Sequence, residues 1–347
     1  MHHLLFSNME HDALVMTSAN IPGEPMIVDD VRIKELKADY YLLHNQPIIN
    51  RADDTVIRTY QNNTQFIRRS RGYVPFSIPF DSKGCAVGLG PQENIAASIA
   101  ADGRIWPTQY IGNGEKIGVI DYLEESVRTQ IGFLGCEPQT IALDLHPGYA
   151  NRPLAKRLSQ EYGCDTLEIQ HHWAHAASLL VDNDKDECIA LTLDGTGHGD
   201  DGTAWGGEVL KTDLHEYRRT AHLETIPLLG SEKALYDIRR LKFAIDSMNG
   251  TENHDFKDSE AAILEKLMTK SVRTSSFGRI LDALSYSLGV CSYRTYDGEP
   301  AMRLEPLLAR GKLVEGFETE TVNGIVRTAD LFHPRSEEHT SELQSLA

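Results

Sequence analysis

The feature that most constrains the fold is a glycine-rich segment that directly follows an apolar run. Residues 188–194 read CIALTLD, which predicts a buried strand that ends at Asp194. The next residues read GTGHGDDGTAWGGE, so glycines are interleaved with Asp, Thr and His. A plain hairpin turn does not need so many glycines, and the Gly-Lys-Ser/Thr of a P-loop is absent. The pattern predicts a strand–turn–strand unit whose backbone N–H groups approach a phosphate.

Three histidines lie just upstream, in the stretch QHHWAHAASL at residues 170–179. His171 and His175 are four residues apart, so on a helix they share one face. Two imidazoles and the carboxylate of Asp194 form a ligand set suited to Fe(II), Zn or Mn. His172 lies three residues before His175, so the spacing leaves open whether His171 or His172 binds the metal. We predict a divalent metal next to a nucleotide phosphate.

Composition excludes several classes of function. The chain has 347 residues and a formal net charge of −17, which argues against a protein that mainly binds nucleic-acid backbone. It has no apolar run long enough to span a bilayer, and its first residues lack the features of a signal peptide. The five cysteines are far apart and form no C-x-x-C pair, which indicates a reduced compartment without a disulfide framework. We expect a cytoplasmic protein that binds neither nucleic acid nor membrane.

The order of strand and helix patterns predicts an α/β fold. In residues 4–80, strands are expected at ALVMTSAN (13–20) and YYLLHNQPI (40–48), and a helix at DDVRIKEL (29–36). From residue 85, strands alternate with helices, including a hairpin with an Asp102–Gly103 turn and a helix closed by Gly135. After Ser231 the pattern becomes helical. We therefore predict an α/β protein with a helical second part.

Several polar clusters occur at predicted element ends. Asp144 and His146 follow a strand, where they form either a turn or part of a site. Residues 274–279, TSSFGR, open a helix; taken alone, they favour a capping motif over an anion site. In residues 4–80, a group of hydroxyl, amide and guanidinium side chains could bind a nucleotide or a carboxylate. The arginines among them could instead belong to a basic edge strand that only contacts solvent. These residues are Thr17, Ser18, Asn20, Arg69 and Arg71.

Motifs along the chain resemble, in order, the HypF family of hydrogenase-maturation carbamoyltransferases. In residues 1–80, LVMTSANIPGEP, HNQPIINRADDTVIR and IRRSRGYVP resemble the C-terminal part of a YrdC-like carbamoyl-adenylating domain. Seven later motifs resemble the family's carbamoyltransferase domain, which has the actin-like ATPase (ASKHA) fold: GLGPQENIAASIA, TQYIGN, ALDLHPGY, QHHWAHAASL, DGTGHGDDGTAWGGE, TSSFGRILDA and YDGEPAMRLE. In antibiotic O-carbamoyltransferases the two domains occur in the reverse order.

The resemblance implies domain boundaries. Residues 1–80 are expected to be the C-terminal part of the YrdC-like domain, and residues 81–334 a carbamoyltransferase domain truncated at its C-terminus. Residues 335–345, RSEEHTSELQS, resemble the in-frame translation of a sequencing adapter, so we expect 335–347 to be a non-native tail. The chain is thus expected to be a fragment.

The resemblance also implies a reaction. ATP and carbamoyl phosphate yield carbamoyl adenylate, and the carbamoyl group is transferred to the C-terminal cysteine of a HypE-type acceptor protein. The implied cofactors are ATP with Mg²⁺ and a divalent metal (Fe, Zn or Mn). The alternatives are a small-molecule O-carbamoyltransferase and a non-catalytic fragment that binds nucleotide or metal.

Each implied role is assigned to residues of this chain. The metal ligands are His171, His175 and Asp194, and the catalytic candidates are His172, Asp144 and His146. The nucleotide-binding candidates are Thr17, Ser18, Asn20, Arg69, Arg71, Gly195, Thr196, Gly197, Gly206, Gly207 and Glu208.

Overall fold

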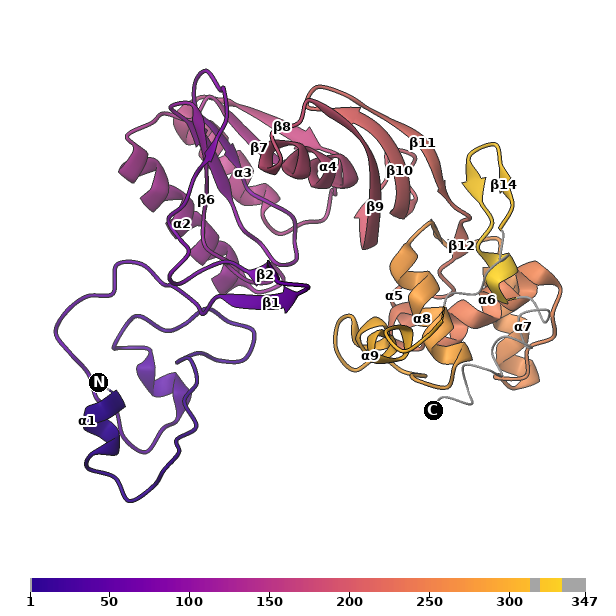
Figure 1. Cartoon of the computed structure of the whole chain (residues 1–347), viewed down its shortest axis with the longest axis horizontal. Helices are drawn as coiled ribbons and strands as arrows, with labels where there is room; N and C mark the ends of the chain where they lie inside the picture. The colour runs from indigo at the N-terminus through magenta and orange to yellow at the C-terminus, as the bar shows by residue number, and fades with distance from the viewer. Residues whose placement is uncertain (1, 313–318, 333–347) are drawn as a thin grey trace. The chain divides into compact units, whose positions relative to one another are not determined.

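The computed structural model describes residues 2–312 and 319–332, which form two compact units that meet in sequence between Glu168 and Ile169 (Figure 1). This division lies inside the predicted second domain, 81–334, and the boundaries at 80 and 334 stay predictions. The expected tail, 335–347, lies outside the described residues.

The first 80 residues contain little regular structure. Before β3 (Ile78–Pro79), their elements are α1 (His2–Phe6), a 3-10 turn (Ile33–Leu36), and a hairpin of β1 (Val56–Tyr60) and β2 (Asn63–Arg68). The strands predicted at 13–20 and 40–48 are wrong, and the helix predicted at 29–36 is reduced to the 3-10 turn. A strand needs a partner and a covered face, whereas Val15 is 96% and Leu42 101% exposed.

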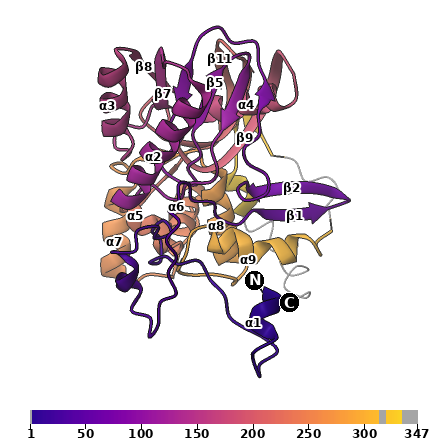
Figure 2. The same ribbon diagram turned by 90° about the vertical axis from the view of Figure 1, so that its left-hand side faces the viewer.

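The rest of the first unit is a mixed sheet with the strand order β3-β6-β5-β4-β7-β8. The hairpin predicted at Asp102–Gly103 is confirmed, since both residues have positive φ, and Gly135 ends α2 in the left-handed conformation as predicted. Helices α2 and α3 lie side by side (Figure 2) and share one hydrophobic core with the strands. The elements are β3 (Ile78–Pro79), β4 (Ala86–Gly88), β5 (Ser98–Ala101), β6 (Arg104–Pro107), α2 (Ile117–Leu134), β7 (Thr140–Asp144), α3 (Arg152–Tyr162) and β8 (Asp165–Ile169).

The second unit joins a sheet to a group of helices. Its sheet has the order β12-β13-β10-β11-β15-β14, and β9 pairs with β10 outside this path. The strands are β9 (Glu187–His198), β10 (Ala204–Asp213), β11 (Tyr217–Leu223), β12 (Ile226–Pro227), β13 (Arg273–Thr274), β14 (Thr321–Val322) and β15 (Ile325–Val326). α4 (His171–Asp182) packs on β9 and β10 through Ala176, Ala190 and Leu210.

The helical second part predicted after Ser231 is confirmed. Its helices gather beside β12 (Figure 1) around a core that includes Ile238 and Leu241. They are α5 (Glu232–Tyr236), α6 (Arg239–Asn249), α7 (Asp258–Leu267), α8 (Phe277–Ser287) and α9 (Glu299–Leu308), followed by a 3-10 turn (Ala329–Phe332). In the described parts of the chain, no helix has the length and apolar character needed to cross a membrane.

Strand β9 differs from its prediction in two respects. It continues to His198, so Asp194 lies within the strand and not at its end. It is also not buried on both faces, because Ile189, Leu191 and Leu193 are 72%, 70% and 55% exposed. The reason is that α4 covers one face of β9, while no other described element covers these three side chains. We call them the aliphatic ridge.

Candidate functional site

The histidines lie at the start of α4 because Gln170 begins the helix. Its side-chain oxygen accepts a hydrogen bond from the backbone N–H of Trp173 (2.9 Å), which satisfies one of the free donors of the first turn. The indole of Trp173 donates to the carbonyl of Asp213 at the end of β10 (3.0 Å). The first turn of α4 is therefore held against the sheet.

His171, His175 and Asp194 come together as one cluster. The distance from His171 Nε2 to Asp194 Oδ2 is 2.9 Å, and the two histidine Nε2 atoms are 3.2 Å apart. His175 Nε2 lies 3.7 Å from the same carboxylate oxygen. One ligand atom from each residue lies within 4.8 Å of the others. The side chain of His171 is 11% exposed and that of His175 is 56% exposed, so solvent reaches the cluster at His175.

His172 occupies a different position from its neighbours. Its side chain is fully buried, and its Nε2 atom lies 3.8 Å from Asp194 Oδ2 without a hydrogen bond among the described residues. Burial lowers the pKa of His172 to about 4, so the ring is neutral at pH 7. Of the two histidines that the spacing left open, His171 is the one nearer the carboxylate. A catalytic role for His172 stays a prediction.

The carboxylate of Asp194 is ionised although it is partly buried. Burial alone would raise its pKa, but interactions with His171 and His175 hold the pKa well below its usual range. Its second oxygen accepts a hydrogen bond from the N–H of Gly195 (2.6 Å). An ionised carboxylate beside two imidazoles is the donor set that binds borderline divalent metals.

Two glycines of the predicted phosphate loop allow close packing. A Cβ atom on Gly197 would lie 2.5 Å from Cε1 of His172 and 2.8 Å from Cδ2 of His171. A Cβ on Gly206 would lie 2.7 Å from the carbonyl oxygen of Asp194. Gly197 therefore lets β9 approach the two histidines, and Gly206 lets β10 approach the backbone of Asp194. Contact of the glycine-rich segment with nucleotide stays a prediction; its members are Gly195, Thr196, Gly197, Gly206 and Gly207.

Glu208, also predicted to contact nucleotide, is buried and surrounded by protein donors. Its carboxylate accepts hydrogen bonds from the N–H groups of Gly206 (3.0 Å) and Gly207 (3.2 Å) and from Ser275 Oγ (2.5 Å). It also pairs with Nε of Arg219 at 2.6 Å. The structure thus shows Glu208 supporting the glycine turn, and contact with nucleotide stays a prediction.

Arg219 was not identified from the sequence. Its guanidinium lies 4.0 Å from the ring of Trp205 and also pairs with Asp201 (3.2 Å). No motif marks Arg219, because it lies on β11 and reaches Glu208 only through sheet pairing between β10 and β11. Only the fold brings the two together.

The capping motif predicted at residues 274–279 is confirmed. Ser276 is the N-cap of α8, and its Oγ accepts from the N–H of Arg279 (3.2 Å). The same hydroxyl donates toward the carbonyl oxygens of Gly195 (2.7 Å) and Asp194 (3.0 Å). The N-terminal end of α8 is therefore tied to the strand segment that carries the metal-ligand candidate.

Asp144 and His146 form a turn in the first unit, whereas His172 lies in the second. Asp144 Oδ1 accepts a hydrogen bond from the N–H of His146 (2.8 Å), and the His146 ring stacks on Tyr149 with centroids 4.2 Å apart. The structure brings these two candidates together. Their catalytic role stays a prediction.

The nucleotide candidates of the first 80 residues form two separate groups. Ser18 hydrogen-bonds to Asn20 (2.5 Å), whose amide donates to the carbonyl of Glu24 (3.2 Å). Arg69 packs over the ring of Phe76 (4.0 Å), and Arg71 donates to the carbonyl of Ala52 (2.8 Å). In this part of the described chain, no hydrogen bond or ion pair joins Thr17, Ser18 or Asn20 to the two arginines. Their shared role stays a prediction.

Comparison with known families matches three successive segments. Residues 1–70 match the Sua5/YciO/YrdC model, which is described as "Telomere recombination". Residues 81–182 match the HypF Kae1-like domain, and residues 190–345 match the second subdomain of the Kae1-like carbamoyltransferase domain. The order of the matches is the order of the motifs in the sequence.

Individual relatives match almost the whole chain. The chain is 38% identical to the probable carbamoyltransferase HypF of Methanocaldococcus jannaschii, over 96% of its own length and 46% of the relative. It is 32% identical to the carbamoyltransferase HypF of Rhodobacter capsulatus, over 96% of its own length and 47% of the relative. The chain thus spans about half the length of these relatives.

Solved structures point to the same family as the sequence relatives. A crystal structure of full-length HypF in a phosphate- and nucleotide-bound form aligns with a TM-score of 0.87 and 30% identity, covering 98% of this chain and 55% of that one. HypF of T. kodakarensis aligns with a TM-score of 0.83 and 36% identity, covering 94% and 45%. The fold is therefore mixed α/β, with a YrdC-like N-terminal part and Kae1-like (ASKHA) domains. The chain belongs to the HypF carbamoyltransferase family.

Proposed function

We propose that this chain is part of a cytoplasmic carbamoyltransferase that acts in nickel–iron hydrogenase maturation and holds a divalent metal at His171, His175 and Asp194. The observation that carries the proposal is this cluster of three ligand atoms within 4.8 Å. It lies in a chain whose relatives are named carbamoyltransferases over nearly its whole length. The proposed reaction forms carbamoyl adenylate from ATP and carbamoyl phosphate. The carbamoyl group is then transferred to the C-terminal cysteine of a HypE-type acceptor.

The donor set fits the proposed metal. Two imidazole nitrogens and one ionised carboxylate oxygen are ligands for Fe(II), Zn or Mn, while Mg²⁺ is expected only with ATP. When bound, such a metal polarises an oxygen of the carbamoyl or phosphate group and stabilises developing negative charge. In this proposal, α4 and β9 hold the three ligands in place.

In this proposal, other residues of the chain bind and orient the nucleotide. The tie between Ser276 and Gly195 presents the N-terminal end of α8 beside the cluster, where the helix dipole favours an anionic group. We propose that the nucleotide lies along the glycine-rich segment there. None of the five cysteines is needed as the nucleophile, because the attacking thiolate belongs to the acceptor protein.

Metal binding to the purified chain tests the proposal first. Equilibrium dialysis against Zn²⁺, Mn²⁺ and Fe²⁺ should show one tightly bound equivalent. His175→Ala and Asp194→Ala should each weaken the affinity by more than the roughly 10–100-fold typical of losing an outer-shell partner. The matched control is His215→Ala, which removes an exposed histidine of a turn outside the cluster. Equal affinity in the wild type, the two ligand variants and the control would contradict the assignment.

Transfer by the full-length protein separates the candidate functions. The acceptor is a synthetic peptide with the C-terminal sequence of a HypE-type protein. Carbamoylation of its cysteine supports the proposed reaction. Transfer only to sugar or nucleoside hydroxyls supports an O-carbamoyltransferase. Binding of ATP and metal without turnover supports a non-catalytic role.

A further inference from the structure

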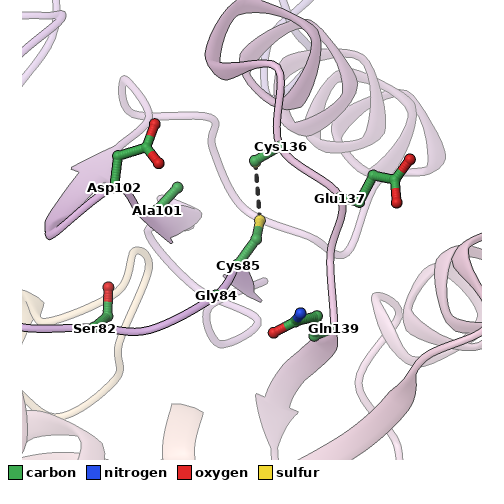
Figure 3. A pocket seen from close by; sticks show the side chains of 8 residues that line it. All are labelled: Ser82, Gly84, Cys85, Ala101, Asp102, Cys136, Glu137 and Gln139. Atoms are coloured by element: carbon green, nitrogen blue, oxygen red, sulfur yellow. Dashed lines mark hydrogen bonds between the residues drawn. The ribbon is translucent and has the colours of Figure 1, made fainter.

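A pocket of about 340 Å³ in the first unit is lined by two cysteines that face each other (Figure 3). The Sγ atoms of Cys85 and Cys136 are 2.9 Å apart, and both residues are free thiols. Cys85 directly precedes β4, and Cys136 follows the residue that ends α2. Nothing in the proposed transfer reaction uses these thiols.

The backbone holds both cysteines in this position. The N–H of Gln139 donates to the carbonyl of Cys85 (2.8 Å), and β4 and β7 pair in parallel directly after it. Gly84 has a φ of +89°, and a Cβ at that position would clash with the side chain of Gln139. On the other side, left-handed Gly135 turns the chain out of α2 toward Cys136. The backbone, and not only the side-chain rotamers, therefore places the two thiols close together.

We propose that Cys85 and Cys136 form an oxidisable dithiol that reacts with small, amine-bearing disulfides. The preference for a cationic reagent follows from the lining of the pocket, which contains the carboxylates of Asp102 and Glu137 and no Lys or Arg. The sequence indicates a protein without a disulfide framework, so the bond would form only when an oxidant is supplied.

The reaction proceeds by two thiol–disulfide exchanges. The half-buried Cys136 loses its proton and attacks one sulfur of the reagent; the reagent's S–S bond breaks and its first thiolate takes up a proton. Cys85 then attacks the Cys136 sulfur of the mixed disulfide, its proton goes to the second leaving thiolate, and the Cys85–Cys136 bond forms. Two protein thiols are oxidised and one reagent disulfide is reduced to two thiols.

The environments of the two thiols set this order. Cys85 is only 6% exposed, whereas Cys136 is half-buried and lies at the pocket wall. Burial, with further contributions from Cys136 and Asp102, raises the pKa of Cys85 to about 12. Cys85 therefore stays protonated until the mixed disulfide brings a target sulfur next to it.

Cystamine is the probe that tests the proposal. Reduced wild-type chain is incubated with excess cystamine, the remaining thiols are alkylated, and the protein is digested for mass spectrometry. The free thiol count should fall from five to three, with one peptide linking Cys85 to Cys136. The melting temperature should rise, because the bond joins residues 51 positions apart. A reductant should reverse both changes.

Two serine variants sharpen the test. Cys85→Ser should stop at a mixed disulfide on Cys136, because the resolving thiol is gone. Cys188→Ser, which removes a half-buried cysteine of β9, should still form the bond. The proposal is overturned if the folded wild type keeps all five thiols, retains the reagent on Cys136, or links Cys136 to Cys164.

Discussion

At Gly197, the absence of a side chain lets β9 lie directly against two histidines of α4. The space that a Cβ would need is already filled by ring atoms of His172 and His171. Gly195, two residues earlier on the same strand, has open space in the corresponding direction. One of these glycines is thus required by packing, whereas packing leaves the other free to change.

Replacement of the two glycines should separate these roles. Gly197→Ala should lower the free energy of unfolding by about 1–3 kcal/mol, the usual cost of overpacking, and should weaken metal binding by displacing His171. Gly195→Ala should leave stability nearly unchanged. Urea unfolding of both variants, followed by metal dialysis, measures the two effects. Equal stability losses would mean that the clash at Gly197 is relieved without cost.

The cluster could be predicted from the sequence only in part. The helical spacing of His171 and His175 and the apolar run before Asp194 are local signals, and they indicated the three residues that meet. The choice between His171 and His172 could not be predicted, because burial of His172 depends on how α4 packs on β9. Arg219 was missed for the same reason, since its link to Glu208 crosses two strands.

Among the elements, α8 shows how a helix end and a strand stabilise each other. Its N-cap hydroxyl, on Ser276, bonds both its own first turn and the carbonyls of β9. The TSSFG motif predicted the cap, but not the strand that the same hydroxyl contacts. Loss of the hydroxyl would therefore affect two elements at once.

Ser276→Ala should lower the free energy of unfolding by about 1–2 kcal/mol, the upper range for loss of an N-cap. The control is Ser287→Ala on the same helix, whose hydroxyl bonds only the carbonyl of Ala283 within α8. That variant should change stability by less than about 0.5 kcal/mol. Chemical denaturation compares the two, and a similar loss in both would argue against the tie to β9.

Helices α2 and α3 are linked by charge. Glu124 of α2 bonds Arg128 on its own helix and Arg157 of α3. Partial burial acts to raise the pKa of Glu124, but its bonds to Arg157 and Arg128 lower it below the ordinary value. A lowered folded-state pKa stabilises the fold above the unfolded-state pKa, about 4.3, and this stabilisation is lost as the pH falls through the folded-state value.

Glu124→Gln should therefore reduce stability at pH 7 by at most about 1 kcal/mol, as expected for a largely surface network. The difference from the wild type should shrink as the pH falls below about 4. Thermal unfolding across this pH range provides the measurement. A gap between the two proteins that is constant with pH would exclude the ion pairs as its cause.

The elements that could be predicted were those whose own sequence contains the residue that forms their turn or ends their helix. The Asp102–Gly103 hairpin and the helix closed by Gly135 each carry their own turn residue and formed as predicted. The strands predicted at 13–20 and 40–48 have suitable side chains, but strand formation needs a neighbouring strand, and the described residues around them supply none. Propensity alone therefore misjudged these two segments.

At the scale of the whole molecule, net charge and exposed apolar surface act in opposite directions. The net charge of −17 keeps copies of the chain apart, while the aliphatic ridge of Ile189, Leu191 and Leu193 favours association. β9 pairs with β10 alone among the described strands, so the ridge lies next to an unpaired strand edge. Salt screens the repulsion without weakening the apolar contact, so self-association should increase with ionic strength.

Leu191→Thr should therefore raise the protein concentration at which light scattering begins, with the largest gain at high salt. Threonine keeps the strand preference of the position while removing apolar surface. The control is Leu42→Thr, which changes a still more exposed leucine outside any sheet. Equal gains from both variants would show that total apolar exposure, and not the ridge, drives association.

The alternation along β9 also limits which changes of chain length the protein tolerates. Asp194 points toward α4, where it meets His171, while its neighbour Leu193 points to the opposite face. Because side chains of a strand alternate with a period of two, a single-residue insertion or deletion within β9 before Asp194 would exchange these faces. The carboxylate would then leave the histidines and point to the opposite face of the sheet. Relatives that keep the cluster should therefore differ in length only outside this stretch of the strand, because even a two-residue shift would carry the carboxylate along β9 and away from His171.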